Sequence, residues 1–406
     1  MFHTISSRVS SPQLRLSLTK SLIPCALSIP LSRCCSMNPS RYFHTCFSSD
    51  NYSGVHPAVL QKLHQKNQEI PFAPAYSDHK QEVERSLRQR VFDNEGLDVW
   101  MVGIGTAANV LGIRTCLRSN YESVICASQS HIRVHELNCM ELFSGAQVIE
   151  VPVDTETGGK IQIEQVRKIL VPERDCHSTR PRVLSLTSPT EFGSVYTMHE
   201  LKAFSELCKQ YDMFLHLDGA RFANAVAAMG GINAAVEIGK YIDVLSFGGT
   251  KNGMMGAEAV VFMNHPHRTP FHLDEFERIR KQGLQLFSKT RFLTYQFEAL
   301  LEDDLWLKLG EKSNRYAKEI ASAITELNSP LVSLHTPLET NQIFARVRRD
   351  LVTALNEEFK FYTWEELDDG YNIIRLVTSS EIPQDVVNVF IEKLQSLVKT
   401  LSTQKQ

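Results

Sequence analysis

Two charged residues, Asp218 and Lys251, each stand at the end of a short apolar run. Asp218 closes Phe214-Leu-His-Leu-Asp218, and Lys251 follows Asp243-Val-Leu-Ser-Phe-Gly-Gly-Thr, thirty-three positions later. Short apolar runs rich in β-forming residues predict buried strands. Because open α/β sheets bind ligands at the carboxyl ends of their strands, we expect both charges to emerge at one ligand-binding edge.

An acid and an amine at neighbouring strand ends suit the cofactor pyridoxal phosphate (PLP). The lysine amine can hold the PLP aldehyde as a Schiff base. The aspartate can keep the pyridine nitrogen protonated, so that the ring accepts electrons from a carbanion. Taken singly, such an aspartate is more often a helix cap or an ion-pair partner, and a lysine after two glycines is more often a solvated loop residue. The cofactor hypothesis therefore depends on further matching residues.

Further residues supply this support, because they resemble a known enzyme family. The stretch from Asp218-Gly-Ala-Arg221 to Lys251-Asn-Gly-Met-Met-Gly256-Ala-Glu is similar to the low-specificity L-threonine aldolases, which are fold type I PLP enzymes. The other matches, in chain order, are Ser49-Asp50-Asn51, Gly105-Thr-Ala-Ala-Asn109, His131, Thr190-Glu-Phe-Gly193 and Ile374-Arg375-Leu-Val-Thr378. The resemblance extends from about Phe47 to about Thr378, which is most of the chain.

The order of elements indicates an α/β fold. Helix-like and strand-like stretches alternate from Gly54 to about Met263, which predicts a mainly parallel sheet covered by helices on both faces. The resemblance implies the fold type I, aminotransferase-like architecture, with a seven-stranded sheet in a large domain and a smaller C-terminal α+β domain. We therefore divide the chain into a leader (1–44), an N-terminal segment with the large PLP-binding domain (45–290), and the small domain (291–406).

Local signals predict individual elements. Thr197-Met-His-Glu200 is a capping-box pattern and predicts a helix that ends just before the strand Phe214 to Leu217. In the C-terminal part, we expect short strands around Ile343 to Val347 and Ile373 to Val377, and a closing helix from about Pro383.

The first 44 residues have the composition of an organelle transit peptide. They contain five basic residues, no acidic residue, many serines and several prolines. We expect a disordered mitochondrial (matrix) leader, cleaved near Arg41 to Thr45, and a cytoplasmic protein is the alternative. Apolar runs here are too short for a membrane anchor.

Without the leader the formal charge changes from −3 to about −8, which argues against nucleic acid as a partner.

A small-residue turn follows the predicted strand Val99 to Val102 and opens a helix. Such a turn presents backbone N–H groups and the positive end of a helix dipole to a phosphate. In the resemblance it is the PLP phosphate cradle, formed by the amides of Gly105, Thr106 and Ala107 and by the Thr106 hydroxyl. The same residues match the dinucleotide fingerprint GxGxxA, with Glu122 nearly twenty positions on, so a nucleotide-binding oxidoreductase is an alternative.

His131 follows the apolar run Val124 to Ala127. The resemblance implies that its imidazole stacks on the pyridine face and contacts the substrate hydroxyl. Without the resemblance, a histidine after a strand is more often an ordinary loop residue. Glu136, five residues later, is a candidate for orienting His131.

Arg375 stands among isoleucine, leucine and valine, where a charge needs a partner. Ile373, Arg375 and Val377 share one face of the predicted strand, which would be the exposed face if the strand lay at a sheet edge. The resemblance instead makes Arg375 the bidentate clamp of the substrate α-carboxylate, assisted by Arg221 and Ser49.

The resemblance implies retro-aldol cleavage of threonine, allo-threonine or a related β-hydroxy-α-amino acid to glycine and an aldehyde. Loss of the β-hydroxyl proton breaks the Cα–Cβ bond, and the electrons enter the ring held by Asp218. The group that takes this proton is open among His131, Glu191 and Lys251, because Thr187 to Gly193 lacks a histidine found in another branch of the family. β-Elimination, racemisation or hydroxymethyl transfer on the same fold are alternatives, as is a non-catalytic relative.

The implied partners are an amino-acid substrate and further copies of the chain. The resemblance implies a homodimer or homotetramer with active sites near the subunit interface. His265-Pro-His267 has no cysteine, histidine or acid cluster at ligand spacing, so we expect no metal site. Tyr76-Ser-Asp-His79 departs from the Tyr-Gly-Asp-Asp of many relatives.

Overall fold

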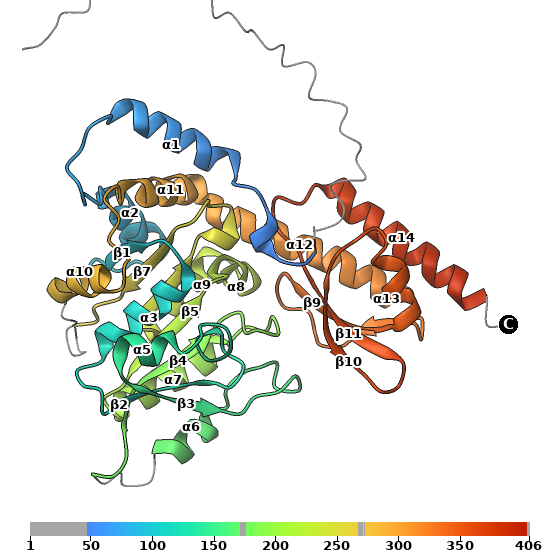
Figure 1. The fold of residues 1–406 in the computed structure, drawn as a ribbon, viewed down its shortest axis with the longest axis horizontal. Coiled ribbons are helices and arrows are strands. Elements are labelled where there is room, and N and C mark those ends of the chain that lie inside the picture. Colours follow the sequence, from blue (N-terminus) through green and yellow to red (C-terminus); the bar gives the residue numbers. More distant parts are fainter. Residues whose placement is uncertain (1–46, 171–175, 267–270, 272, 404–406) are drawn as a thin grey trace, which may run out of the picture. The chain divides into compact units, whose positions relative to one another are not determined.

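The computed structural model describes residues 47–170, 176–266, 271 and 273–403 (Figure 1). The predicted leader, residues 1–44, and His267 lie outside the described residues. The described part of the chain contains one sheet of seven strands and one sheet of four. No helix in this part is both long and apolar enough to cross a membrane.

The seven-stranded sheet is mainly parallel, as predicted. Its spatial order is β1, β7, β6, β5, β4, β2, β3. Strands β3, β2, β4, β5 and β6 run parallel, whereas β7 is antiparallel to both of its neighbours, β6 and β1. The bounds are β1 Asp98–Val102, β2 Glu122–Ala127, β3 Gln147–Val151, β4 Arg180–Thr187, β5 Phe214–Gly219, β6 Val244–Gly248 and β7 Glu258–Phe262.

Helices precede, connect and follow these strands. The α-helices up to β7 are α1 Pro57–Glu69, α2 Gln81–Ser86, α3 Gly105–Cys116, α4 His131–Val134, α5 Cys139–Ser144, α6 Ile163–Leu170, α7 Met198–Gln210, α8 Phe222–Ala228 and α9 Ile232–Tyr241. Those after β7 are α10 Leu273–Gln282, α11 Arg291–Leu301 and α12 Leu305–Glu326. The predicted capping box of α7 is present, with Thr197 and Glu200 exchanging hydrogen bonds.

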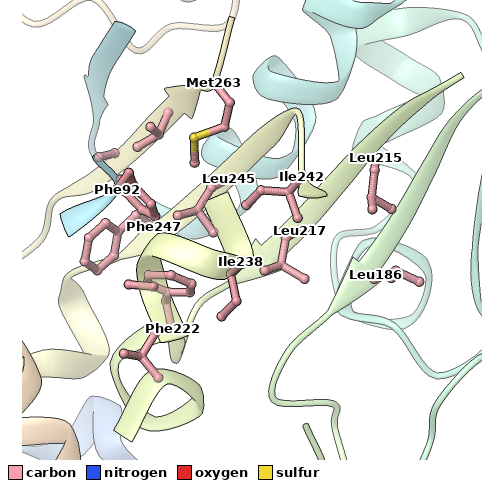
Figure 2. Close-up of a cluster of buried hydrophobic side chains, with 14 of the residues drawn as sticks. Phe92, Leu186, Leu215, Leu217, Phe222, Ile238, Ile242, Leu245, Phe247 and Met263 are labelled. Atoms are coloured by element: carbon pink, nitrogen blue, oxygen red, sulfur yellow. The ribbon is translucent and has the colours of Figure 1, made fainter. Parts of the chain in front are cut away.

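Helices cover both faces of the sheet, which explains why its strands read as continuous apolar runs. Strands β2, β5, β6 and β7 are buried at every position. On one face, Leu215 and Leu217 of β5 pack with Phe222 of α8 and Ile238 of α9 (Figure 2). Side chains of α3, α5 and α10 form a second core on the other face. Polar side chains are therefore accommodated mainly at the strand ends.

The four-stranded sheet is antiparallel throughout, in the order β10, β11, β9, β8. The bounds of these strands and of the helices around them are β8 Val332–Leu334, β9 Gln342–Arg348, α13 Arg349–Leu355, β10 Tyr362–Glu366, β11 Tyr371–Val377 and α14 Gln384–Thr403. The two strands and the closing helix predicted for the C-terminal part are thus confirmed.

Helix α12 contributes side chains to the cores of both sheets. Trp306 belongs to a core of the seven-stranded sheet, and Ile320 belongs to the core of the four-stranded sheet. Phe47, far away in the sequence, is fully buried in this second core, and its carbonyl accepts a hydrogen bond from the Val377 N–H at 2.9 Å. The predicted domain boundary between residues 290 and 291 stays a prediction. Helix α12 follows that boundary and packs into the cores of both sheets, so it belongs to neither sheet alone.

His216 is a buried polar residue in the middle of β5. Ser185 of β4 lies 2.9 Å from its Nδ1 atom, and Ser246 of β6 lies 3.0 Å from its Nε2 atom. Burial lowers the pKa of His216 to about 4, and the charge of Asp218 opposes this only in part. The imidazole is therefore neutral near pH 7, where it joins three strands without a buried charge.

We expect acid to destabilise the protein through His216. Its pKa falls from 6.5 in the ordinary state to about 4 in the folded state, so the unfolded chain binds this proton more readily. Stability should therefore fall as the pH drops through this window, by about 3 kcal/mol in total. In urea unfolding at about pH 7.5 and about pH 4.5, His216→Gln should lose less unfolding free energy than the native protein.

The matched control is His64→Gln, which replaces an exposed histidine of α1. It should lose as much unfolding free energy on acidification as the native protein does. The same acid sensitivity in all three proteins would contradict the role of His216.

Candidate active site

A cavity of about 420 Å³ lies at the carboxyl ends of β4, β5 and β6. Six of the predicted site residues line it: Gly105, Thr106, His131, Asp218, Arg221 and Lys251. A larger hollow of about 800 Å³ runs along α8 and α12, but it contains none of the predicted site residues. The cavity therefore occupies the sheet edge that the positions of Asp218 and Lys251 predicted.

Three predicted site residues do not line this cavity. Ser49 accepts a hydrogen bond from the Asn51 N–H at 3.2 Å and so caps the 3₁₀ helix Asp50–Tyr52, and Asn51 rather than Ser49 reaches the cavity. Ala107 is buried in the first turn of α3. Arg375 lies in β11 of the four-stranded sheet.

The start of α3 forms one wall of the cavity. Ile104, the residue before the helix, is extended and provides no side-chain cap for the first helical N–H groups. A Cβ atom placed on Gly105 would meet no protein atom within 4 Å. Open space in front of uncapped N–H groups at a helix N-terminus fits a phosphate group.

Asp218 is buried at the end of β5 and has two hydrogen-bond donors. The Ala220 N–H donates to its Oδ1 at 3.0 Å, and the Asn109 Nδ2 donates to its Oδ2 at 2.9 Å. Asn109 was part of the predicted phosphate motif, but its contact with Asp218 was not foreseen. Both residues line the cavity.

Glu136 contacts His131, as the hypothesis that it orients this imidazole requires. Nδ1 of His131, the first residue of α4, lies 2.8 Å from the Glu136 Oε1 atom. This hydrogen bond raises the pKa of His131, and the negative charges of Asp218 and Glu191 act in the same direction. Burial raises the pKa of Glu136, although the hydrogen bonds from His131 and Asn109 oppose it.

Lys251 stands in a 3₁₀ turn, Thr250–Asn252, which Glu258 of β7 holds from the side. The Gly249 N–H donates to Oε2 of Glu258 at 2.7 Å, and the Thr250 hydroxyl donates to Oε1 at 2.6 Å. Burial raises the pKa of Glu258 to about 7, and the charge of Lys251 counteracts part of the rise. Glu258 also lines the cavity, a position that its place at the end of the Lys251 to Glu258 motif does not predict.

Arg221 forms a buried ion pair with Asp50. The guanidinium donates from Nε at 2.6 Å and from Nη2 at 3.0 Å to the two carboxylate oxygens. Burial alone would raise the pKa of Asp50, but the charges of Arg221 and Lys251 outweigh it and leave the pKa below its ordinary value. Sequence reasoning missed this partner, since Asp50 lies in the N-terminal segment.

Arg375 does not lie on an edge strand, because β11 pairs with β10 on one side and β9 on the other. Its guanidinium lies 5.4 Å from the ring centres of Tyr362 and Trp364. Its Nε atom is buried and has no hydrogen-bond partner within the described chain. Burial lowers the pKa of Arg375, as does the nearby charge of Arg221. An anion would stabilise this cation.

The dinucleotide alternative disagrees with the topology. Strand β1, which precedes the GxGxxA turn, is an edge strand and pairs only with the antiparallel β7. Glu122 lies at the first position of β2 rather than at its carboxyl end, and it accepts a hydrogen bond from the Arg118 N–H at 2.6 Å. Glu122 is therefore not placed to bind a ribose beside this turn.

Comparisons with known proteins agree with this geometry. The sequence profile of the β-eliminating lyase family matches residues 47–350. A low-specificity L-threonine aldolase of Pseudomonas aeruginosa is 36% identical over 319 residues, which are 78% of this chain and 89% of that protein. A low-specificity L-threonine aldolase of Eremothecium gossypii is 27% identical over 265 residues, covering 65% of this chain and 66% of that protein.

Solved structures extend the comparison to the fold. A threonine aldolase of Leishmania major superposes with a TM-score of 0.79 at 29% identity, covering 87% of this chain and 99% of that one. The match includes nearly all of the described residues, and it confirms the predicted fold type I architecture. The chain therefore belongs to the β-eliminating lyase family of PLP-dependent enzymes, among the relatives of the low-specificity L-threonine aldolases.

Proposed function

We propose that this lyase cleaves threonine, allo-threonine and related β-hydroxy-α-amino acids to glycine and an aldehyde. The observation that carries the proposal is the meeting of Lys251 and Asp218 in one cavity, in a chain that is 36% identical to a low-specificity L-threonine aldolase. Lys251 is the only lysine among the described residues that line this cavity. Its amine is thus the group available for the cofactor aldehyde.

The cavity walls fit PLP in three places. The start of α3 would bind the phosphate through the N–H groups of Gly105, Thr106 and Ala107. Asp218 would hold a proton on the pyridine nitrogen, and Lys251 would bond to the aldehyde carbon. PLP supplies the carbonyl that captures the substrate amine and the ring that withdraws its electrons.

Arg375 is the side chain best suited to the substrate α-carboxylate. Arg221 is also a guanidinium, but Asp50 already accepts two of its hydrogen bonds. Arg375 has a buried Nε without a partner in the described chain, so it has donor capacity left for an anion. In this proposal Arg221 and Ser49 support the carboxylate site indirectly, by holding the N-terminal segment against it.

The β-hydroxyl proton has three candidate acceptors in the cavity: His131, Glu191 and Lys251. The hydrogen bond to Glu136 raises the pKa of His131 and occupies its Nδ1 atom, so Nε2 is the ring nitrogen available to the β-hydroxyl. His131, Glu191 and Lys251 all stay candidates for proton removal in this proposal. If Glu191 or Lys251 removes the proton, His131 donates a hydrogen bond from Nε2 and holds the substrate in position.

A product assay tests the reaction. With threonine or allo-threonine, the native protein should release glycine and acetaldehyde in equal amounts, without ammonia or keto acid. Lys251→Ala should lose turnover by several orders of magnitude, because it removes the amine that bonds to the cofactor. Lys240→Ala, at an exposed lysine of α9, is the matched control and should retain native turnover.

Other outcomes of this assay identify other reactions. Ammonia and keto acid without glycine would assign β-elimination in place of aldol cleavage. Inversion of an amino acid at Cα without cleavage would assign racemisation.

Substitution of Arg375 tests the carboxylate site. In Arg375→Lys the ammonium cannot present two parallel donors to one carboxylate. Loss of one charge-assisted hydrogen bond costs about 1.5–3 kcal/mol, so kcat/KM for threonine should fall about ten- to a hundredfold. Arg346→Lys is the control, since Arg346 lies on the adjacent strand β9 and pairs with Asp369. Equal kcat/KM values in both variants would contradict the assignment.

We propose further that copies of the chain associate near the active site, as a homodimer or homotetramer. Ile104 and Met255 line the cavity, yet these residues are 55% and 60% exposed. Large apolar side chains at the mouth of a polar cavity are typical of surfaces that another subunit covers.

We also propose that residues 1–44 direct the protein to the mitochondrial matrix. A protein that lacks residues 1–44 should be soluble and active but should fail to enter mitochondria. A protein that lacks residues 1–52 should lose stability and activity as well, because this deletion removes Phe47 from the second core and Asp50 from Arg221. Fractionation, urea unfolding and the product assay measure these effects. If the protein that lacks residues 1–44 still entered mitochondria, the proposed role of these residues as a targeting leader would be contradicted. A cytoplasmic location is the alternative to mitochondrial targeting.

A further inference from the structure

Asn109 lies between two buried acids. Its Nδ2 atom donates to Asp218 Oδ2 at 2.9 Å and to Glu136 Oε1 at 3.0 Å. Asn109, Asp218 and Glu136 are each no more than 3% exposed. A side-chain amide carries two N–H groups, so each acid receives one of them. The neutral amide of Asn109, in α3, thus donates to two carboxylates, that of Asp218 in β5 and that of Glu136 just after α4.

The two acids have different partners on their far sides. Asp218 faces the cavity and accepts a second hydrogen bond from the Ala220 N–H at 3.0 Å. Glu136 receives Nδ1 of His131 at 2.8 Å. In the proposed function, Asp218 binds the protonated pyridine nitrogen of PLP, and Glu136 binds the imidazole N–H of His131. An ionised acid binds either group more strongly than a neutral acid does.

Two buried oxygen atoms of this cluster have no hydrogen-bond partner within the described chain. The Oε2 atom of Glu136 is buried and has no partner within the described chain, so Oε1 receives both of the hydrogen bonds of this acid. Oδ1 of Asn109 is also without a partner there. The opposite amide orientation would direct Oδ1 at two carboxylates, so the hydrogen-bonding environment selects the donor orientation.

We propose that Asn109 is a positioning residue that separates Asp218 from Glu136 and allows both to be ionised, so that Asp218 serves the cofactor while Glu136 orients His131. The inference deepens the proposed function, because it rests on the roles given there to Asp218 and His131. Asn109 itself neither accepts nor releases a proton.

Removal of the amide should act on His131 through Glu136. Burial and the charge of Asp218 raise the pKa of Glu136, whereas the Asn109 hydrogen bond lowers it. Without that bond Glu136 takes up a proton more readily, and the His131 imidazole loses its ionised acceptor. The pKa of His131 should therefore fall. The other titratable groups that face His131 are His135, Asp218 and Glu191, and the substitution leaves all three in place.

The experiment is an NMR titration of the histidine ring signals in the purified full-length protein with its bound cofactor. His131→Asn assigns the His131 signal. In Asn109→Ala the pKa of His131 should fall by about one unit, a tenfold change in its proton dissociation constant. Asn224→Ala is the matched control: Asn224 is a buried asparagine of α8 that donates to Ser313 and Asn314, and its loss should leave the His131 titration unchanged.

A second substitution separates positioning from general disruption. In a Glu136→Gln background the acid is absent, so Asn109→Ala should produce no further change in the pKa of His131. A shift of the same size in both backgrounds would overturn the proposal, and so would an unchanged titration in folded Asn109→Ala. If Asn109→Ala does not fold, Asn109→Ser keeps one donor and should give a smaller fall in the same direction; no fall there would also overturn the proposal.

The titration does not measure aldol cleavage. If the enzyme catalyses a different PLP reaction, the product assay fails while the His131 result stands, so the two failures are distinguishable.

Discussion

The burial of β5 and β6 on both faces limits where polar chemistry can occur in this protein. A charge within these strands would lie between two apolar cores, where an unpaired charge is strongly unfavourable. His216 is tolerated there because it is neutral and two serines accept or donate its hydrogen bonds. Charged groups that act on a ligand are placed where the cores end, and Asp218 and Lys251 occupy those positions. The cavity is therefore a consequence of how the sheet is covered.

The predicted site residues differ in whether their charges are already paired within the described chain. Asp50 neutralises Arg221, and Glu136 accepts the hydrogen bond of His131. Within the described chain, Arg375 has an Nε without a partner. Lys251 lies beside Glu258, whose carboxylate oxygens are both engaged by the Lys251 turn. In the proposed reaction, the Lys251 amine would bond to the cofactor aldehyde, and Arg375 would donate hydrogen bonds to the substrate carboxylate.

Local sequence patterns were sufficient to predict the mainly parallel sheet, the helix that follows the capping box, and the strand-end positions of Asp218 and Lys251. The number of strands in the sheet and the role of His131 were predicted only from the family resemblance. The roles of Asp50 and Asn109 were not predictable in this way, because Asp50 meets Arg221 across 171 positions and Asn109 meets Asp218 across 109. Such contacts depend on the packing of whole elements. Strand pairing is also a contact between whole elements, so the sequence around Arg375 could not exclude an edge strand. In the structure β11 has β9 on one side and β10 on the other.

The segment directly after the predicted leader forms part of the active-site framework. Phe47 fills the core of the four-stranded sheet, and Asp50 binds Arg221 beside the cavity of the seven-stranded sheet. The Tyr52 hydroxyl lies 2.9 Å from the Tyr362 hydroxyl, next to Arg375 in the register of β10 and β11. One short segment therefore contacts both the cavity residue Arg221 and the strand that pairs with Arg375. Because these contacts begin at Phe47, removal of residues 1–44 would leave all of them in place, whereas removal of residues 1–52 would delete the contacts of Phe47, Asp50 and Tyr52 together.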